Sequence, residues 1–151
     1  MKKSKNISKS KGFDLPTKEV RSAKENQHTI ESVFQRNPAW QLNSVDIEHN
    51  KWGWKHLGNN DPIALLKKLS DYELRTWGEI HQDKKRDHYV AMNDLSQEAQ
   101  KRLKELNLGD IEKLFRLRFE GKLRIWGILH QHIFKIIWLD PEHTVCPSSK
   151  R

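Results

Sequence analysis

Three arginines and one histidine in the last third of the chain are residue types that can act on a phosphodiester. Arg116, Arg118 and Arg124 lie in the stretch LFRLRFEGKLR, and His143 follows in WLDPEHTVCP. Cleavage of RNA without a metal requires a deprotonated 2′-hydroxyl, a stabilised phosphorane charge and a protonated leaving oxygen. Arginines stabilise the charge, and a histidine with a pKa near ~6.5 can move either proton. The same residues also fit a second interpretation, a face that binds phosphate without chemistry.

The arginines are expected to share one face of a β-hairpin. Residues 114–119 alternate strictly, which places Arg116 and Arg118 opposite the apolar Phe115 and Leu117. Such alternation is typical of a strand with one buried side.

The loop of this hairpin sets the register of its two strands. Phe119-Glu120-Gly121 predicts a three-residue loop, with Gly121 taking a positive φ. That loop pairs Arg118 with Lys122 and Arg116 with Arg124, whereas a two-residue loop at Glu120-Gly121 would mix basic and apolar side chains on each face. We therefore predict the three-residue loop and add Lys122 to the phosphate-binding set.

Other segments supply the elements that position this hairpin. His130-Gln131-His132 predicts a turn into a strand over 133–139, which is apolar on both faces and therefore central or covered. Asn37-Pro38 precedes a first strand in AWQLNSVDIEH, and HYVAM at residues 88–92 fits either a short strand or a loop. Trp52 and Trp54 alternate around Gly53, so we expect both rings on one side, in the core or its rim rather than as a stacking platform.

Two helices are predicted between the first strand and the hairpin. Asp61-Pro62 gives an N-cap and a first-turn proline for a helix that runs to about His81. Its predicted buried stripe is Ile63, Leu66, Leu69, Trp77 and Ile80. Asp94 with Gln97 predicts the start of a second helix that ends near Gly109. Its predicted buried face is Leu95, Ala99, Leu103 and Leu106.

These elements define an α+β fold class. We predict a small antiparallel sheet, made of the N-terminal strand and a C-terminal three-stranded meander, packed against two helices. Residues 1–37 are basic and poor in large apolar side chains, which predicts a flexible tail. The domain is expected over 38–147, and residues 148–151 are expected to fray.

Composition bounds the partners and the compartment. The 151 residues hold 28 Lys and Arg against 20 Asp and Glu, a net charge of +8. This favours a polyanion such as RNA, DNA, the ribosome or an acidic protein, although surface charge for solubility is an alternative reading. Cys146 is the single cysteine and no apolar run reaches the ~20 residues needed to span a bilayer, so we expect a cytoplasmic protein without internal disulfides. His130-x-His132 and the pair His143 and Cys146 do not form a four-ligand set, so we expect no metal site and no cofactor.

The predicted order of strand, two helices and three-stranded meander resembles the RelE/ParE superfamily of bacterial toxins. Members carry a (K/R)-x-(K/R)-x-x-G-x-x-R pattern in the first hairpin, which here reads from Arg116 to Arg124. The chain is also similar to a branch of bacterial and mobile-element proteins that end in W-x-D-P-x-H-x-V-x-P. The resemblance covers residues 39–147 in element order but only 114–147 in motif.

The resemblance implies a RelE-like fold and a metal-independent endoribonuclease that cleaves mRNA on the ribosome. By position, Arg116, Arg118 and Lys122 would bind RNA phosphate, Arg124 would stabilise the transition state, and His143 would be acid, base or phosphate contact. An acidic antitoxin would be the protein partner. The C-terminal tyrosine common in the family is absent here, since Val145 and Cys146 follow His143. The alternative function is a non-catalytic nucleic-acid-binding or protein-interaction module on the same scaffold.

Overall fold

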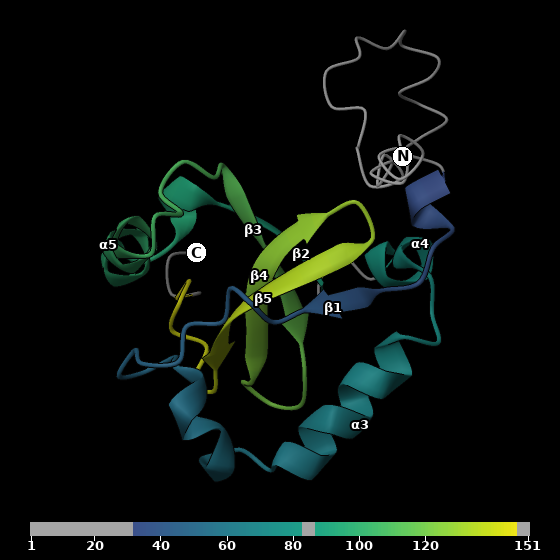
Figure 1. Ribbon diagram of the computed structural model, residues 1–151, viewed down its shortest axis with the longest axis horizontal. Coiled ribbons are helices and arrows are strands. Elements are labelled where there is room, and N and C mark those ends of the chain that lie inside the picture. The colour runs from purple at the N-terminus through teal and green to yellow at the C-terminus, as the bar shows by residue number, and fades with distance from the viewer. Residues whose placement is uncertain (1–31, 83–86, 148–151) are drawn as a thin grey trace, which may run out of the picture. The chain divides into compact units, whose positions relative to one another are not determined.

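The computed structural model describes residues 32–82 and 87–147, which form an α+β fold around a five-stranded mixed sheet (Figure 1). The strands are β1 (Ala39–Gln41), β2 (His88–Ala91), β3 (Lys113–Arg118), β4 (Arg124–His130) and β5 (Ile133–Asp140). The helices are α3 (Pro62–Tyr72), α4 (Trp77–His81) and α5 (Gln97–Glu105), with 3-10 turns η2 (Trp54–Asn59) and η3 (Met92–Asp94). The predicted flexible tail, residues 1–37, lies outside the described residues up to residue 31, and so does the predicted frayed end at 148–151.

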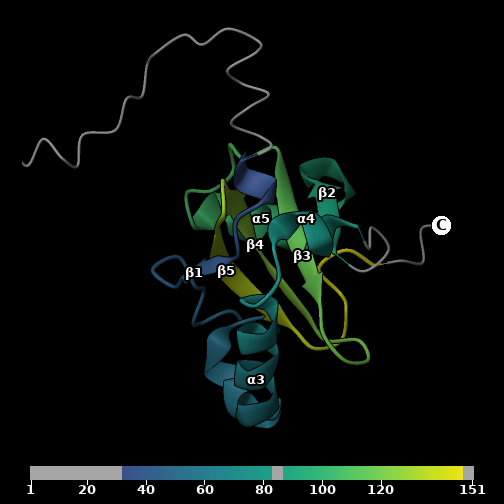
Figure 2. The ribbon, with the colours of Figure 1, turned by 90° about the vertical axis from the view of Figure 1, so that its right-hand side faces the viewer.

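The strands follow the spatial order β1-β5-β4-β3-β2, which Figure 2 shows from one edge to the other. The meander β3-β4-β5 is antiparallel as predicted, but two features differ from the prediction. β1 pairs with β5 in parallel, so the sheet is mixed rather than antiparallel. HYVA forms β2, an additional edge strand that pairs with β3. Both differences arise from pairing between segments distant in sequence, which local patterns do not specify.

The predicted helix over 61–81 is two helices. Asp61 caps α3 through a hydrogen bond from Ala64 N, with Pro62 in the first turn as expected. Thr76 and Glu79 then form a complete capping box that starts α4. Because this box satisfies the first amides of a new helix, the chain turns between Tyr72 and Thr76 instead of continuing.

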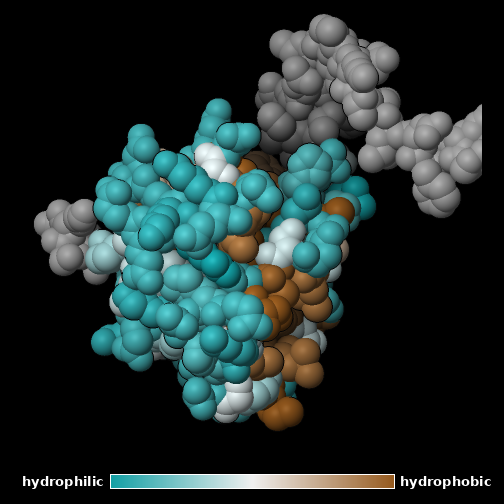
Figure 3. Space-filling view, turned by 60° about the vertical axis from the view of Figure 1, so that its left-hand side comes forward, coloured by the Kyte–Doolittle hydropathy of each residue, from teal (hydrophilic) through white to brown (hydrophobic). Residues whose placement is uncertain are grey.

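The break changes which side chains α3 buries. Leu65 and Tyr72 are buried and Leu69 is partly buried. Ile63 and Leu66, predicted to be in the stripe, are 67% and 65% exposed. They belong to a set of exposed apolar side chains, and Figure 3 shows a hydrophobic band beside a mostly hydrophilic surface.

Helices cover both faces of the sheet, with α3 and α4 on one side and α5 on the other (Figure 1). The first core cluster joins Trp77 and Ile80 of α4 to Phe115, Leu117 and other side chains of the sheet. The second joins the other side of the sheet to α5 through the predicted residues Leu95, Ala99 and Leu103. The cap of α5 is Ser96 rather than Asp94.

Trp52 and Trp54 lie in different clusters. Trp52 is 1% exposed in the α5 cluster, whereas Trp54 packs against the α3–α4 cluster. The expectation that both rings share a side is therefore wrong, and the expectation that they belong to the core or its rim is confirmed. The segment that carries them lies along β5, where Leu139 N donates to Trp52 O at 3.0 Å.

A β-bulge in β5 makes room for this segment. Trp126 pairs with Trp138 but Gly127 pairs with Ile136, so Ile137 is the extra residue. Its carbonyl oxygen accepts from Asp46 N at 2.9 Å and from Trp54 Nε1 at 3.2 Å. Gly127 sits where the strands come close, since a Cβ there would lie 2.2 Å from Lys135 O.

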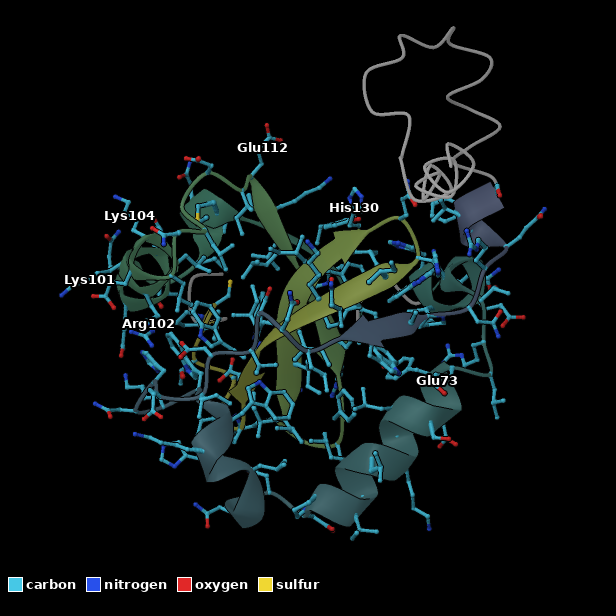
Figure 4. The ribbon with its side chains drawn as sticks, viewed as in Figure 1. Glu73, Lys101, Arg102, Lys104, Glu112 and His130 are labelled. Atoms are coloured by element: carbon cyan, nitrogen blue, oxygen red, sulfur yellow. The ribbon has the colours of Figure 1, made fainter. Side chains whose placement is uncertain are left out.

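A buried ion pair fixes the same segment to α5. Asp46 is 3% exposed and receives hydrogen bonds at 2.8 Å from Arg102 Nε, Arg102 Nη2 and Trp138 Nε1. Burial alone would raise the pKa of Asp46, but these hydrogen bonds and the Arg102 charge lower it overall. Figure 4 shows Arg102 on α5 near Lys101 and Lys104, which are exposed.

Candidate phosphate-binding site

The β3–β4 hairpin keeps the predicted faces but not the predicted register. Arg118 pairs with Arg124 and Arg116 pairs with Trp126, so residues 119–123 form the connection. The predicted pairs Arg118 with Lys122 and Arg116 with Arg124 are therefore wrong. Phe119 is 3% exposed, and its N donates to Leu123 O at 2.9 Å. Because Phe119 packs into the core, the hairpin closes between Phe119 and Leu123, on either side of Gly121. The register is displaced by two residues, and an even displacement leaves every side chain that stays within the two strands on its predicted face.

One face of the sheet is covered by α5 at one end. The arginines lie on the same face, at its other end. One cross-strand row reads His88, Arg116, Trp126 and Trp138, and the next reads Arg118, Arg124 and Asp140. Direct cross-strand partners point to the same side of a sheet. The structure thus brings Arg116, Arg118 and Arg124 together, as the alternation predicted.

The arginines differ in exposure. Arg116 and Arg124 are 8% and 6% exposed, whereas Arg118 is half-buried. Arg124 Nη1 donates to Gly121 O at 2.8 Å and to Leu123 O at 3.0 Å, which ties its guanidinium to the hairpin loop. Burial lowers the pKa of Arg116, and the nearby Arg118 charge acts in the same direction.

Lys122 lies at the edge of this cluster. It is in the exposed turn rather than on a strand, and its Nζ lies 3.8 Å from Glu142 Oε1 with both side chains more than two-thirds exposed. Such a surface pair contributes little to stability. Lys122 is therefore positioned to contact a ligand at the rim but does not share the arginine face.

The motif WLDPEHTVCP folds back over this end of the sheet, held by Asp140. The carboxylate is 0% exposed and accepts from Thr144 N at 2.9 Å, Val145 N at 3.0 Å and Trp126 Nε1 at 3.0 Å. Val145 O in turn accepts from Ser96 N at 2.8 Å, which joins the motif to the start of α5. Asp140 thus caps a turn.

His143 sits in this turn, next to Arg116. Its φ of 60° lies in the left-handed region that non-glycine residues seldom adopt. Its Nε2 lies 3.2 Å from Arg116 Nη1, and because a guanidinium can only donate, Nε2 is the acceptor in this contact. Burial, followed by the charges of Arg124 and Arg116, lowers the pKa of His143. A neutral imidazole can act as a base once the lone pair of Nε2 is released from the Arg116 N–H.

Sequence reasoning missed two residues of this site, Asp87 and His88. Asp87 is 2% exposed, accepts from Arg118 N at 2.8 Å and lies 3.2 Å from the Tyr72 hydroxyl. This arrangement fixes the start of β2 against the end of β3 and sets His88 opposite Arg116. The alternation of His88, Tyr89 and Val90 was the available signal, but HYVAM is too short for periodicity to identify a strand.

A shallow hollow extends from the arginines toward α3. It is lined by Lys68, Arg118, Phe119, Glu120 and Gly121. Lys68 and Arg118 give it two positive charges against the single carboxylate of Glu120.

The arrangement concentrates positive charge where ordinary packing does not call for it. Arg118 and Arg124 are direct cross-strand neighbours, and like charges in that position are destabilising unless an anion or a carboxylate compensates. Buried Asp87 and Asp140 supply part of that compensation. Arginine also binds phosphate through paired N–H donors. Arg118, the more exposed of the three arginines, is the one that a phosphate oxygen could reach.

Other ligand classes have less support in the residues described. Among residues 32–82 and 87–147 there is no group of three or more His, Cys, Asp or Glu side chains suited to a metal ion. In the same ranges no helix is both long and apolar enough to span a bilayer. His130 is exposed at the β4–β5 turn, and His132 Nε2 accepts from Arg36 Nη2 at 3.2 Å.

Comparison of the chain with protein-family models, curated proteins and solved structures finds no match.

Proposed function

We propose that this protein is a RelE-like, toxin-related protein that binds RNA phosphate at the arginine cluster and cleaves mRNA without a metal. The observation that carries the proposal is the cross-strand pair of Arg118 and Arg124, with Arg116 beside them in contact with His143. Guanidiniums can stabilise the phosphorane charge and a neutral imidazole can take the proton of the 2′-hydroxyl, which are two of the three requirements of metal-independent cleavage.

Each residue has a role in this proposal. Arg118 and Lys122, the more exposed cations, bind the phosphates of the strand. Arg116 and Arg124 stabilise the charge that develops on the phosphorane. His143 takes the proton of the 2′-hydroxyl, for which its lowered pKa keeps it in the base form.

The scaffold is compatible with the proposed family. A first strand, helices and a three-stranded antiparallel meander occur in the order expected of RelE and ParE relatives. β2 lies between the helices and α5 covers the second face of the sheet. In this proposal the protein acts in the bacterial cytoplasm on RNA or the ribosome, and an acidic antitoxin covers the cationic surface.

Cleavage of RNA by purified protein tests this proposal. Wild-type protein, Arg118→Ala and Lys101→Ala are each incubated with single-stranded RNA and with mRNA on bacterial ribosomes, and the cuts are mapped. Each variant removes one cation, but only Arg118 belongs to the site. We expect wild type and Lys101→Ala to cut alike, and Arg118→Ala to cut more slowly. Intact RNA in both settings with wild type would refute cleavage.

A non-catalytic nucleic-acid-binding module is the second candidate function. It is favoured by the burial of Arg124 and by the hydrogen bonds from its Nη1 to two backbone carbonyls, which suit a structural role. This candidate predicts salt-sensitive RNA binding at the same residues without strand cleavage.

A further inference from the structure

Two histidines reach Arg116 from different parts of the fold. His88 is its cross-strand partner on β2, the edge strand on one side of β3. His143 follows β5, on the other side of β3, and its Nε2 lies 3.2 Å from Arg116 Nη1. The two histidines therefore belong to the segments on either side of Arg116.

The side chain of His88 is fixed on the arginine face by the pairing of β2 with β3. Tyr89 and Phe115 are cross-strand partners and their rings lie 5.0 Å apart in the α3–α4 layer. Val90 and Leu114 are the next partners and both belong to the α5 cluster. His88 points to the same side as Val90 because the residues of a strand alternate. It is half-buried, so part of the ring reaches solvent.

We propose that His88 is a second catalytic residue of this site, the general acid that protonates the leaving oxygen of RNA. The proposal rests on the function proposed above and adds a residue that lies outside the hairpin motif. His143 is the base of the same step.

The step balances with these two residues alone. Arg116 Nη1 moves from His143 Nε2 to the phosphate, and the freed Nε2 takes the proton of the 2′-hydroxyl while the 2′-oxygen forms a bond to phosphorus. The bond from phosphorus to the 5′-oxygen breaks, and protonated His88 gives its proton to that oxygen. The products are a 2′,3′-cyclic phosphate and a 5′-hydroxyl, and water can then return the proton from His143 to His88.

The two rings meet different parts of the site. His88 follows the buried Asp87 in the chain and lies opposite Arg116 of β3. His143 faces Arg116 and Arg124, and its burial together with these cations favours its neutral form, the form that a base requires.

A sulfur-substituted RNA tests the acid role directly. The linkage that wild-type protein cuts is first mapped, and a second RNA is made with sulfur in place of the bridging 5′-oxygen at that linkage. A thiolate leaves without a proton, so the sulfur RNA does not need a general acid. Single-turnover cleavage of both RNAs is measured for wild type, His88→Gln, His143→Gln and the control His130→Gln. His130 lies exposed at the far end of β4 (Figure 4).

We expect His88→Gln to cut the oxygen RNA about 10²- to 10⁴-fold more slowly than wild type but to cut the sulfur RNA at close to the wild-type rate. His143→Gln is expected to be slow on both, and His130→Gln to match wild type on both. If His88→Gln cuts the oxygen RNA normally, or is equally slow on both RNAs, His88 is not the acid. If wild type cuts neither RNA, the proposed function itself fails, which is a distinct result. If His88→Gln unfolds, judged by its circular dichroism, His88→Asn is measured in its place.

Discussion

The carboxylate of Asp140 holds the C-terminal motif WLDPEHTVCP on the sheet by hydrogen bonds. Replacing one of its two oxygens should weaken this attachment. Asp140→Asn keeps the shape of the side chain but replaces one oxygen with an amide that donates. In the native turn Oδ2 accepts from Trp126 Nε1 and Val145 N, and Oδ1 accepts from Thr144 N. If the oxygen of the asparagine takes the Oδ2 position, its NH2 group takes the Oδ1 position and faces Thr144 N. Two hydrogen-bond donors then face each other in a buried place.

The expected loss follows from these three hydrogen bonds. A buried donor without a partner costs about 1–3 kcal/mol, and hydrogen bonds to a charged acceptor contribute about 1.5–3 kcal/mol each, part of which the neutral amide retains. Loss of the negative charge also leaves Arg116 and Arg124 with less compensation. We therefore expect Asp140→Asn to lower the free energy of unfolding by about 3–5 kcal/mol, a large part of the roughly 5–15 kcal/mol typical of a domain.

Urea unfolding measured by tryptophan fluorescence suits this test, because Trp52, Trp77, Trp126 and Trp138 are at most 1% exposed. With a slope of about 1–3 kcal/mol per M, the midpoint should fall by roughly 1–5 M. Glu142→Gln changes an exposed carboxylate in the same turn and should shift the free energy by less than ~0.5 kcal/mol. If the two variants have the same midpoint with unchanged slopes, Asp140 does not hold the turn.

Three further perturbations have defined expectations. Gly127→Ala should destabilise the fold by about 3 kcal/mol in urea unfolding, because its Cβ would lie 2.2 Å from Lys135 O. Arg102→Ala should cost about 3–5 kcal/mol in the same assay, because it leaves the carboxylate of Asp46 buried with a side-chain exposure of 1%. The fold should also weaken as pH falls below about 6.5, because the pKa of His143 is lower when folded and the unfolded chain then binds more protons. His143→Gln should reduce the difference between urea midpoints at pH 7.5 and pH 5.

Each of these has a matched control in the chain. Gly58→Ala places a Cβ where no atom lies within 4 Å, so it should leave stability nearly unchanged. Lys101→Ala removes an exposed cation from the same helix as Arg102. His130→Gln removes an exposed histidine and should keep the full pH response. Equal effects of a variant and its control would contradict the corresponding expectation.

The sequence predicted the arginine face but not its register, and the reason lies in the period of a strand. Arg116, Arg118 and Arg124 share a face in any register displaced by an even number of residues, so alternation alone is sufficient. The actual displacement depends on the burial of Phe119, a contact with the helical layer that the hairpin sequence does not contain. For the same reason the sequence predicts Lys122 on a strand, whereas in the structure it lies in the turn.

Long-range contacts account for the other differences. The burial of Arg116 depends on a segment more than twenty residues later that folds over it through His143. The parallel pairing of Ala39 with Ile133 joins residues almost a hundred positions apart. The break before α4 was readable in the sequence, because Thr76 and Glu79 form a capping box, but the apolar stripe through Trp77 and Ile80 concealed it. The burial of Leu65 instead of Leu66 follows from that break.

The salt dependence of RNA binding tests the central claim most directly. Binding of a fluorescent single-stranded RNA is measured by anisotropy across a range of salt concentrations for wild type and two double variants of equal net charge. Arg118→Ala with Lys122→Ala removes two cations of the candidate site, and Lys101→Ala with Lys104→Ala removes two exposed cations of α5 (Figure 4). We expect weaker binding and a slope of log affinity against log salt that is shallower by about 1.4 for the site variant alone. Identical slopes and affinities for the two double variants would contradict it.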